Sequence, residues 1–206
     1  MRYFVKALSI LFHPLLLPTL VFSLIFFYLP EMVMPLLPPM FGAVLSIIGI
    51  STLLIPCAVV YTLYKMNVVA TADITDRKDR FIPQALSTLV YAGTTYLLYQ
   101  RLSLVPCLYI IMCSVTICML TVTVVNFYWK ISAHATGMGG FCALAFYIAF
   151  HYPYFPGLFI VAFTSLLVAA LVMSSRMYLQ VHTLGQVTMG FLVGFSVGLV
   201  GVSNIS

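Results

Sequence analysis

The chain has 206 residues, of which 63% are hydrophobic and only 6% are charged. A soluble protein of this size needs far more polar surface to cover its core, so the composition excludes a soluble globular domain and indicates an integral membrane protein. The net charge of +5 comes from cations at scattered boundaries. We therefore expect anionic lipid or phosphate as a partner, and no nucleic acid.

The apolar runs are each long enough for a helix to cross roughly 30 Å of hydrocarbon. They predict an all-α fold, a polytopic transmembrane helical bundle of about six to seven spans, organised as a single membrane-embedded domain over residues 1–206. The first run could be a signal peptide, but Pro14 and Pro18 interrupt it and no small-residue cleavage site follows, so we expect a retained span. Hydropathy predicts seven helices: residues 8–29, 40–64, 84–99, 103–127, 138–150, 157–174 and 183–202.

The cysteines all lie inside or at the ends of apolar runs, and none is paired at metal-ligand spacing. We interpret them as small packing residues and expect neither a metal nor a cofactor. Their positions are 57, 107, 113, 118 and 142.

Two predicted turns, at Arg101 and at residues 151–156, make hairpins of the neighbouring helices. The segments around Arg80, His134 and His182 are then separated by even numbers of crossings and should emerge on one membrane face. Eight of the nine Lys and Arg residues lie on that face, which by the positive-inside tendency is cytoplasmic.

Three polar segments, at residues 73–83, 130–137 and 175–186, carry the candidate chemistry. The first is the densest in charge, with six of the thirteen Lys, Arg, Asp and Glu residues of the chain. In a chain this apolar, such a cluster marks a membrane boundary or a functional site. If the third segment is helical, His182 and Gln186 are four residues apart on one face, and the amide could orient the imidazole.

The second segment leads into a predicted helix whose first turn holds Gly139 and Gly140. A helix N-terminus presents unpaired N–H groups and a partial positive charge, which suits a phosphate group.

The order and spacing of these motifs resemble those of the type-2 phosphatidic acid phosphatase and haloperoxidase superfamily. That family carries Ser-Arg, five residues, His, three residues, Asp, and the present chain has Ser175, Arg176 and His182 at the same spacing. Its Pro-Ser-Gly-His motif is matched in part by Ser132 and His134. The resemblance spans more than half of the chain.

The chain departs from the family pattern in two places. Gln186 stands where the family carries the aspartate that orients the nucleophilic histidine. In the first motif, which is Lys, six residues, Arg-Pro in the family, Arg80 is followed by Pro83 after two extra residues, and Asp73 occupies the lysine position.

The resemblance implies a membrane lipid phosphatase that works without a metal. His182 would attack phosphorus to give a phosphohistidine, and His134 would protonate the leaving alkoxide. Arg80 and Arg176 would bind the phosphoryl oxygens, with a hydrogen bond from Ser132. Gln186 would orient His182, and further candidates for the phosphate are Lys130 and Lys78. Many bacterial members of the family work on the outer face of the inner membrane. The resemblance therefore implies the bacterial inner membrane, with the site on the face opposite to the cytoplasmic one that the charge count indicates.

Two alternatives remain at this point. Asp73, Asp76 and Asp79 are spaced like the magnesium-binding aspartates of intramembrane prenyltransferases, although the only other carboxylate is Glu31. A neutral Gln186 and the altered first motif would also suit a pseudoenzyme that binds lipid phosphate or a protein partner. Substrate candidates for the phosphatase are phosphatidic acid, phosphatidylglycerophosphate, polyprenyl diphosphate and lipid A.

Overall fold

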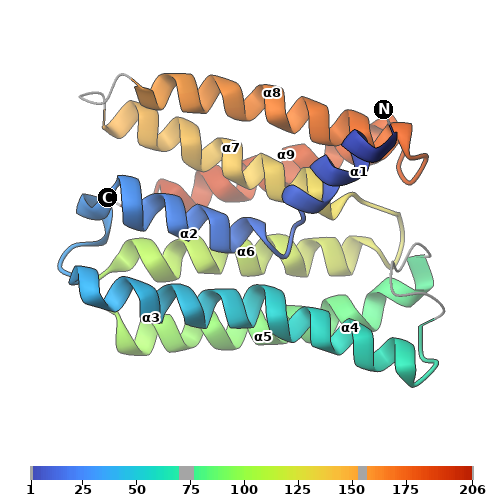
Figure 1. Cartoon of the computed structure of the whole chain (residues 1–206), viewed down its shortest axis with the longest axis horizontal. Coiled ribbons are helices and arrows are strands. Elements are labelled where there is room, and N and C mark those ends of the chain that lie inside the picture. Colours follow the sequence, from blue (N-terminus) through green and yellow to red (C-terminus); the bar gives the residue numbers. More distant parts are fainter. Residues whose placement is uncertain (1, 70–76, 153–156, 206) are drawn as a thin grey trace. The chain divides into compact units, whose positions relative to one another are not determined.

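The computed structural model describes residues 2–69, 77–152 and 157–205, and these residues are helical with no strand among them. Figure 1 shows the elements. In chain order they are α1 (Arg2–Leu11), α2 (Leu17–Tyr28), the short 3-10 helix η1 (Pro30–Val33), α3 (Pro38–Gly49), the π-helical turns η2 (Ile50–Leu54), α4 (Ile55–Lys65), α5 (Arg77–Arg101), α6 (Pro106–Val125), α7 (Ala133–His151), α8 (Gly157–Tyr178) and α9 (Leu184–Val202).

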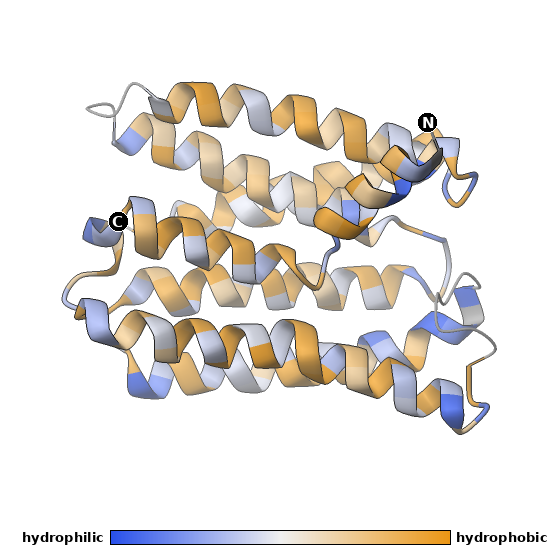
Figure 2. Cartoon of the chain, in the orientation of Figure 1, coloured by the Kyte–Doolittle hydropathy of each residue, from blue (hydrophilic) through white to orange (hydrophobic). Residues whose placement is uncertain are grey.

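Five helical segments in the described part of the chain are long and apolar enough to cross a membrane: Pro38–Lys65, in which α3, η2 and α4 are continuous, and α6, α7, α8 and α9. Large apolar side chains remain exposed along them, such as Ile160 and Leu167 on α8, which suits contact with lipid. Figure 2 shows apolar residues along the helices and hydrophilic residues gathered at helix ends and turns. The all-α membrane class is confirmed. With α2 and α5, the number of helices roughly agrees with six to seven spans.

The first predicted span, residues 8–29, is wrong as a single helix. Helix α1 ends at Leu11 and α2 begins at Leu17. Pro14 lies in the intervening turn, where it has no N–H to give to a helical ladder and its ring hinders continuation. Pro18 lies in the first turn of α2, where a proline is tolerated because that N–H has no intrahelical partner.

The same turn carries the chain from one compact unit to another. Unit 1 comprises residues 1–14 and 130–206, and unit 2 comprises residues 15–129. Helix α1 therefore belongs with α7, α8 and α9, although all of unit 2 lies between them in sequence. The expectation of one phosphatase-like domain over the whole chain stays a prediction.

Unit 2 contains the predicted hairpin with its turn at Arg101, formed by α5 and α6. Polar side chains join the two helices at several levels: the hydroxyls of Thr95 and Thr116 are 2.9 Å apart, and Asn126 Nδ2 donates to Gln84 Oε1 at 2.8 Å. Such pairs satisfy polar groups that lipid cannot solvate. Helix α5 starts earlier than predicted, at Arg77, so the charged cluster contributes to its first turns.

Unit 1 is organised by a close crossing of α7 and α9. Three glycines recur at every fourth position of α9: Gly190, Gly194 and Gly198. A Cβ at Gly194 would overlap the carbonyl oxygen of Thr136, and one at Gly190 would lie 2.7 Å from the carbonyl oxygen of Ser132. Only glycine permits this backbone approach, which is the small-residue packing common between membrane helices. The crossing holds the beginnings of α7 and α9 side by side.

Candidate active site

The predicted residues of the second and third motifs meet at one end of unit 1. The backbone N–H of Ser132, just before α7, donates to the carbonyl oxygen of Gln186 in the first turn of α9 at 3.4 Å. His134, in the first turn of α7, lies close enough to Arg176 and His182 to interact with them electrostatically. Two segments about fifty residues apart in sequence thus form one polar cluster, as the even number of crossings predicted for them.

His182 and Gln186 interact, but the prediction that they share one face of a helix was wrong. His182 lies in the turn before α9, so no helix face carries both residues. Gln186 instead belongs to a capping box in which Thr183 is the N-cap residue. The Oε1 atom of Gln186 accepts from the Thr183 backbone N–H at 3.2 Å and lies 3.1 Å from Nδ1 of His182.

This capping box determines the tautomer of His182. Because the Thr183 N–H can only donate, the oxygen of the Gln186 amide must face it. The same oxygen faces Nδ1 of His182, so Nδ1 must carry a hydrogen. The lone pair of the neutral imidazole is then on Nε2, the nitrogen suited to act as a nucleophile. His182 is buried, with 7% of its surface exposed, so few conformations compete with this one.

His134 has the opposite arrangement. Its Nε2 atom lies 3.1 Å from the carbonyl oxygen of Ser9 on α1. A carbonyl oxygen only accepts, so Nε2 carries the hydrogen and Nδ1 is the nitrogen left for proton transfer. Ser132, the N-cap residue of α7, is fully buried, and its Oγ accepts from the Ala135 N–H at 3.3 Å. The hydroxyl hydrogen of Ser132 can therefore be donated in another direction.

The expected phosphate site at Gly139 and Gly140 is wrong in detail, because α7 begins at Ala133 and not near residue 138. The two glycines lie in the second turn, where backbone N–H groups already bond within the helix. Gly139 instead permits contact with α9, since a Cβ there would overlap the carbonyl oxygen of Phe191. The first turn of α7 is formed by residues 133–136, beside His134.

Arg176 lies in the last turn of α8, with its Nε atom buried. A cation is favourable there because the helix C-terminus carries a partial negative charge. Its charge also acts on His134 and on His13. Arg176 therefore belongs to the same polar cluster as His134. Lys130 lies in the same unit, half-buried, two residues before Ser132.

Sequence reasoning missed the contribution of α1. The hydroxyl of Ser9 lies 3.1 Å from that of Ser175, its carbonyl faces His134, and the ring of His13 meets that of His134 edge to face with centroids 5.1 Å apart. The only local signal was the helix break at Pro14, which does not indicate that the preceding helix packs against residues more than a hundred positions away.

Residues of the first motif lie in unit 2. Arg80 is half-buried in α5, and Lys78 is part of the same helix. Their convergence with the unit 1 cluster stays a prediction. Asp73 and Asp76 lie outside the described residues, and no group of three or more metal-ligating side chains was found among the residues that are described. The magnesium interpretation therefore stays an untested alternative.

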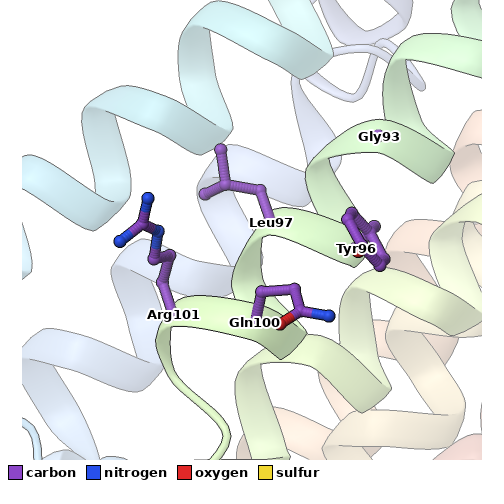
Figure 3. A pocket seen from close by; sticks show the side chains of 5 residues that line it. All are labelled: Gly93, Tyr96, Leu97, Gln100 and Arg101. Atoms are coloured by element: carbon purple, nitrogen blue, oxygen red, sulfur yellow. The ribbon is translucent and has the colours of Figure 1, made fainter.

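A pocket of about 520 Å³ in unit 2 contains none of the predicted site residues. The side chains that line it come from successive turns of α5 (Figure 3). They are Gly93, Tyr96, Leu97, Gln100 and Arg101.

Membrane-spanning helices with a histidine pair and an arginine at one end of unit 1, together with a family match over the same segments, indicate a membrane phosphatase-type protein. Residues 125–205 match the family model of the PAP2 superfamily, which confirms the resemblance predicted from the second and third motifs. The match covers less than half of the chain and does not reach Arg80. No curated protein and no solved structure matches the chain.

Proposed function

We propose that the protein is a metal-independent phosphatase of the bacterial inner membrane that hydrolyses the phosphate or diphosphate group of a lipid through a phosphohistidine at His182. The observation that carries this proposal is the shared oxygen of Gln186, which accepts from Thr183 and from Nδ1 of His182. That oxygen directs the lone pair of His182 to Nε2. The match to the PAP2 superfamily over the same segment supports the reaction class.

In the first step, the Nε2 lone pair of His182 forms a bond to phosphorus. The bond between phosphorus and the lipid oxygen breaks, and its electron pair leaves with that oxygen. His134 enters this step as the imidazolium, protonated on both nitrogens, and donates its Nδ1 proton to the departing oxygen, while its Nε2–H stays on the Ser9 carbonyl. From a phosphate monoester the lipid product leaves as a neutral alcohol, and from a diphosphate it leaves as the lipid monophosphate.

In the second step, water attacks the phosphohistidine. His134 Nδ1, now unprotonated, accepts a proton from that water as the new oxygen–phosphorus bond forms. The bond between phosphorus and Nε2 breaks, its electron pair returns to His182, and inorganic phosphate is released. His134 thus acts as general acid and then as general base, and the enzyme returns to its starting protonation state.

Arg176 and Ser132 are the proposed phosphate ligands within unit 1. The guanidinium group can pair with two phosphoryl oxygens at once, and its charge offsets the negative charge of the transition state. The Ser132 hydroxyl can donate because its oxygen, and not its hydrogen, is used to cap α7. The further ligands that we propose are Lys130, Arg80 and Lys78.

Phosphate release from a panel of lipid phosphates in detergent tests the function. We expect turnover of at least one of phosphatidic acid, phosphatidylglycerophosphate, polyprenyl diphosphate or lipid A in the presence of EDTA, since no step needs a metal. Turnover that depends on added magnesium would instead favour the prenyltransferase-like alternative. Lipid binding without turnover would favour the pseudoenzyme, which the neutral amide of Gln186 supports.

Variants of Gln186 test how its oxygen acts. We expect Gln186→Glu to keep both hydrogen bonds, because the side chain has the same length, and to leave kcat unchanged or raise it, since a carboxylate stabilises the imidazolium of His182. Gln186→Asp should behave similarly if the shorter chain still reaches Nδ1. Gln186→Ala should lower kcat about 100-fold by releasing the ring.

Thr183→Ala is the matched control, because it removes the Thr183 hydroxyl from the capping box and leaves the backbone N–H and Gln186 in place. It should cost about 1 kcal/mol of stability and little activity. Equal losses of kcat in Thr183→Ala and Gln186→Ala would mean that Gln186 serves only the helix.

A further inference from the structure

Helix α1 and the turn after it bring three groups to the cluster that holds His134. The carbonyl oxygen of Ser9 accepts from Nε2 of His134, and the Ser9 hydroxyl joins that of Ser175 at 3.1 Å. His13 follows at the end of this segment, and its ring meets that of His134 with an interplanar angle of 84°. These contacts all lie inside unit 1.

A single hydrogen bond does not hold an imidazole in one orientation. The ring of His134 can rotate about the bond that joins it to Cβ, and a half-turn would exchange Nδ1 with Cδ2 and Nε2 with Cε1, with little change in shape. The Ser9 carbonyl favours the orientation with Nε2 toward α1, but a rotated ring could find other donors and acceptors. The ring of His13 packs against that of His134 nearly at right angles, with centroids 5.1 Å apart, and contact at this distance opposes such a rotation.

The charge of His13 also affects its neighbour His134, which must become an imidazolium to act as the general acid. Burial, and after it the charge of Arg176, lowers the pKa of His13 below its usual value of 6.5. His13 is therefore neutral at pH 7. With Arg176 and His182 already near His134, a second permanent cation at position 13 would oppose the protonated form that acts as the acid.

We propose that His13 is a positioning residue of the phosphatase reaction: by packing edge to face against His134, it holds the general acid with Nε2 on the Ser9 carbonyl and Nδ1 toward the leaving oxygen. This inference rests on the proposed function of His134. It assigns the N-terminal segment, which precedes unit 2 in sequence, to the active site of unit 1.

The test compares two substrates that differ in their need for an acid. The oxygen leaving phosphatidic acid is a poor leaving group and needs a proton, whereas the oxygen leaving p-nitrophenyl phosphate departs without one. We expect His13→Ala to lower kcat for phosphatidic acid about 100-fold, with KM within about twofold, and to change kcat for p-nitrophenyl phosphate by less than about threefold. His13→Phe keeps a ring against His134 and should recover most of the lost rate.

His151→Ala is the matched control, since His151 is an exposed histidine at the opposite end of α7 that bonds to the Tyr147 carbonyl. It should behave as the wild type on both substrates. Equal losses on the two substrates in His13→Ala would indicate general structural damage and overturn the proposal. A His13→Phe variant as slow as His13→Ala would also overturn it, because the ring nitrogens of His13 would then be needed.

A second readout does not depend on activity. Nitrogen-15 NMR of histidine-labelled protein in detergent, assigned with a His134→Gln variant, reports which ring nitrogen of His134 carries the hydrogen. For the neutral ring of His134 we expect Nε2–H in the wild type and in His13→Phe, and a mixture of both tautomers in His13→Ala. An unchanged tautomer in His13→Ala would overturn the positioning role. If the wild type releases phosphate from none of the four lipid phosphates of the panel, the proposed function fails, while this measurement still decides whether His13 positions His134.

Discussion

Replacing His182 with alanine is expected to lower phosphate release by about four orders of magnitude or more, because the phosphohistidine can no longer form. Lipid phosphate should still bind, since Arg176 and Ser132 remain in place. The first measurement is the release of inorganic phosphate from one lipid phosphate in the presence of EDTA. The second uses a lipid with a labelled phosphate group and traps the labelled phosphoprotein by rapid denaturation without acid. The wild type should carry label and His182→Ala should carry none.

Arg176→Ala provides the contrast. It should weaken lipid binding and lower kcat together, because the guanidinium group holds phosphoryl oxygens in both the ground state and the transition state. Thermal stability has to be compared across these variants, since removing a buried polar side chain can disturb packing. A folded His182→Ala protein that releases phosphate at the wild-type rate would show that another residue is the nucleophile.

Gly194→Ala is expected to have the largest effect on stability. The added Cβ would overlap the carbonyl oxygen of Thr136, which is backbone and cannot turn aside, so α7 and α9 must separate. We expect a loss of about 1–3 kcal/mol or more in the free energy of unfolding and a lower apparent Tm in detergent. Phosphate release should fall as well, because the same crossing holds Ser132 beside Gln186.

Gly93→Ala is the control for the Gly194 variant. Gly93 lies in the middle of α5, and a Cβ there would meet nothing within 4 Å. Alanine should therefore raise stability by about 0.5–1 kcal/mol, because it restricts the unfolded chain without a clash. Similar Tm values for Gly194→Ala and the wild type would mean that α7 and α9 are not in close backbone contact in the membrane.

The helical membrane class and the hairpin of unit 2 followed from the sequence because they depend on local properties. Run length and hydropathy decide whether a segment can cross a bilayer, and a short polar turn such as that at Arg101 makes its neighbours antiparallel. The second and third motifs could also be recognised from the sequence, because the spacing of their residues is a property of the chain itself. The PAP2 match covers both motifs. The approach of Arg80 to them stays a prediction.

Only the tertiary structure decided how the site is built. Gln186 meets His182 through the capping box of α9 and not along a helix face, because the chain turns before α9 begins. Gly139 lies in the second turn of α7, because α7 starts five residues earlier than hydropathy indicated, and there it permits the close contact of α7 with α9. His13 joins the cluster through packing between segments more than a hundred residues apart, and such packing depends on shape and close backbone approach, which no local pattern of residues encodes.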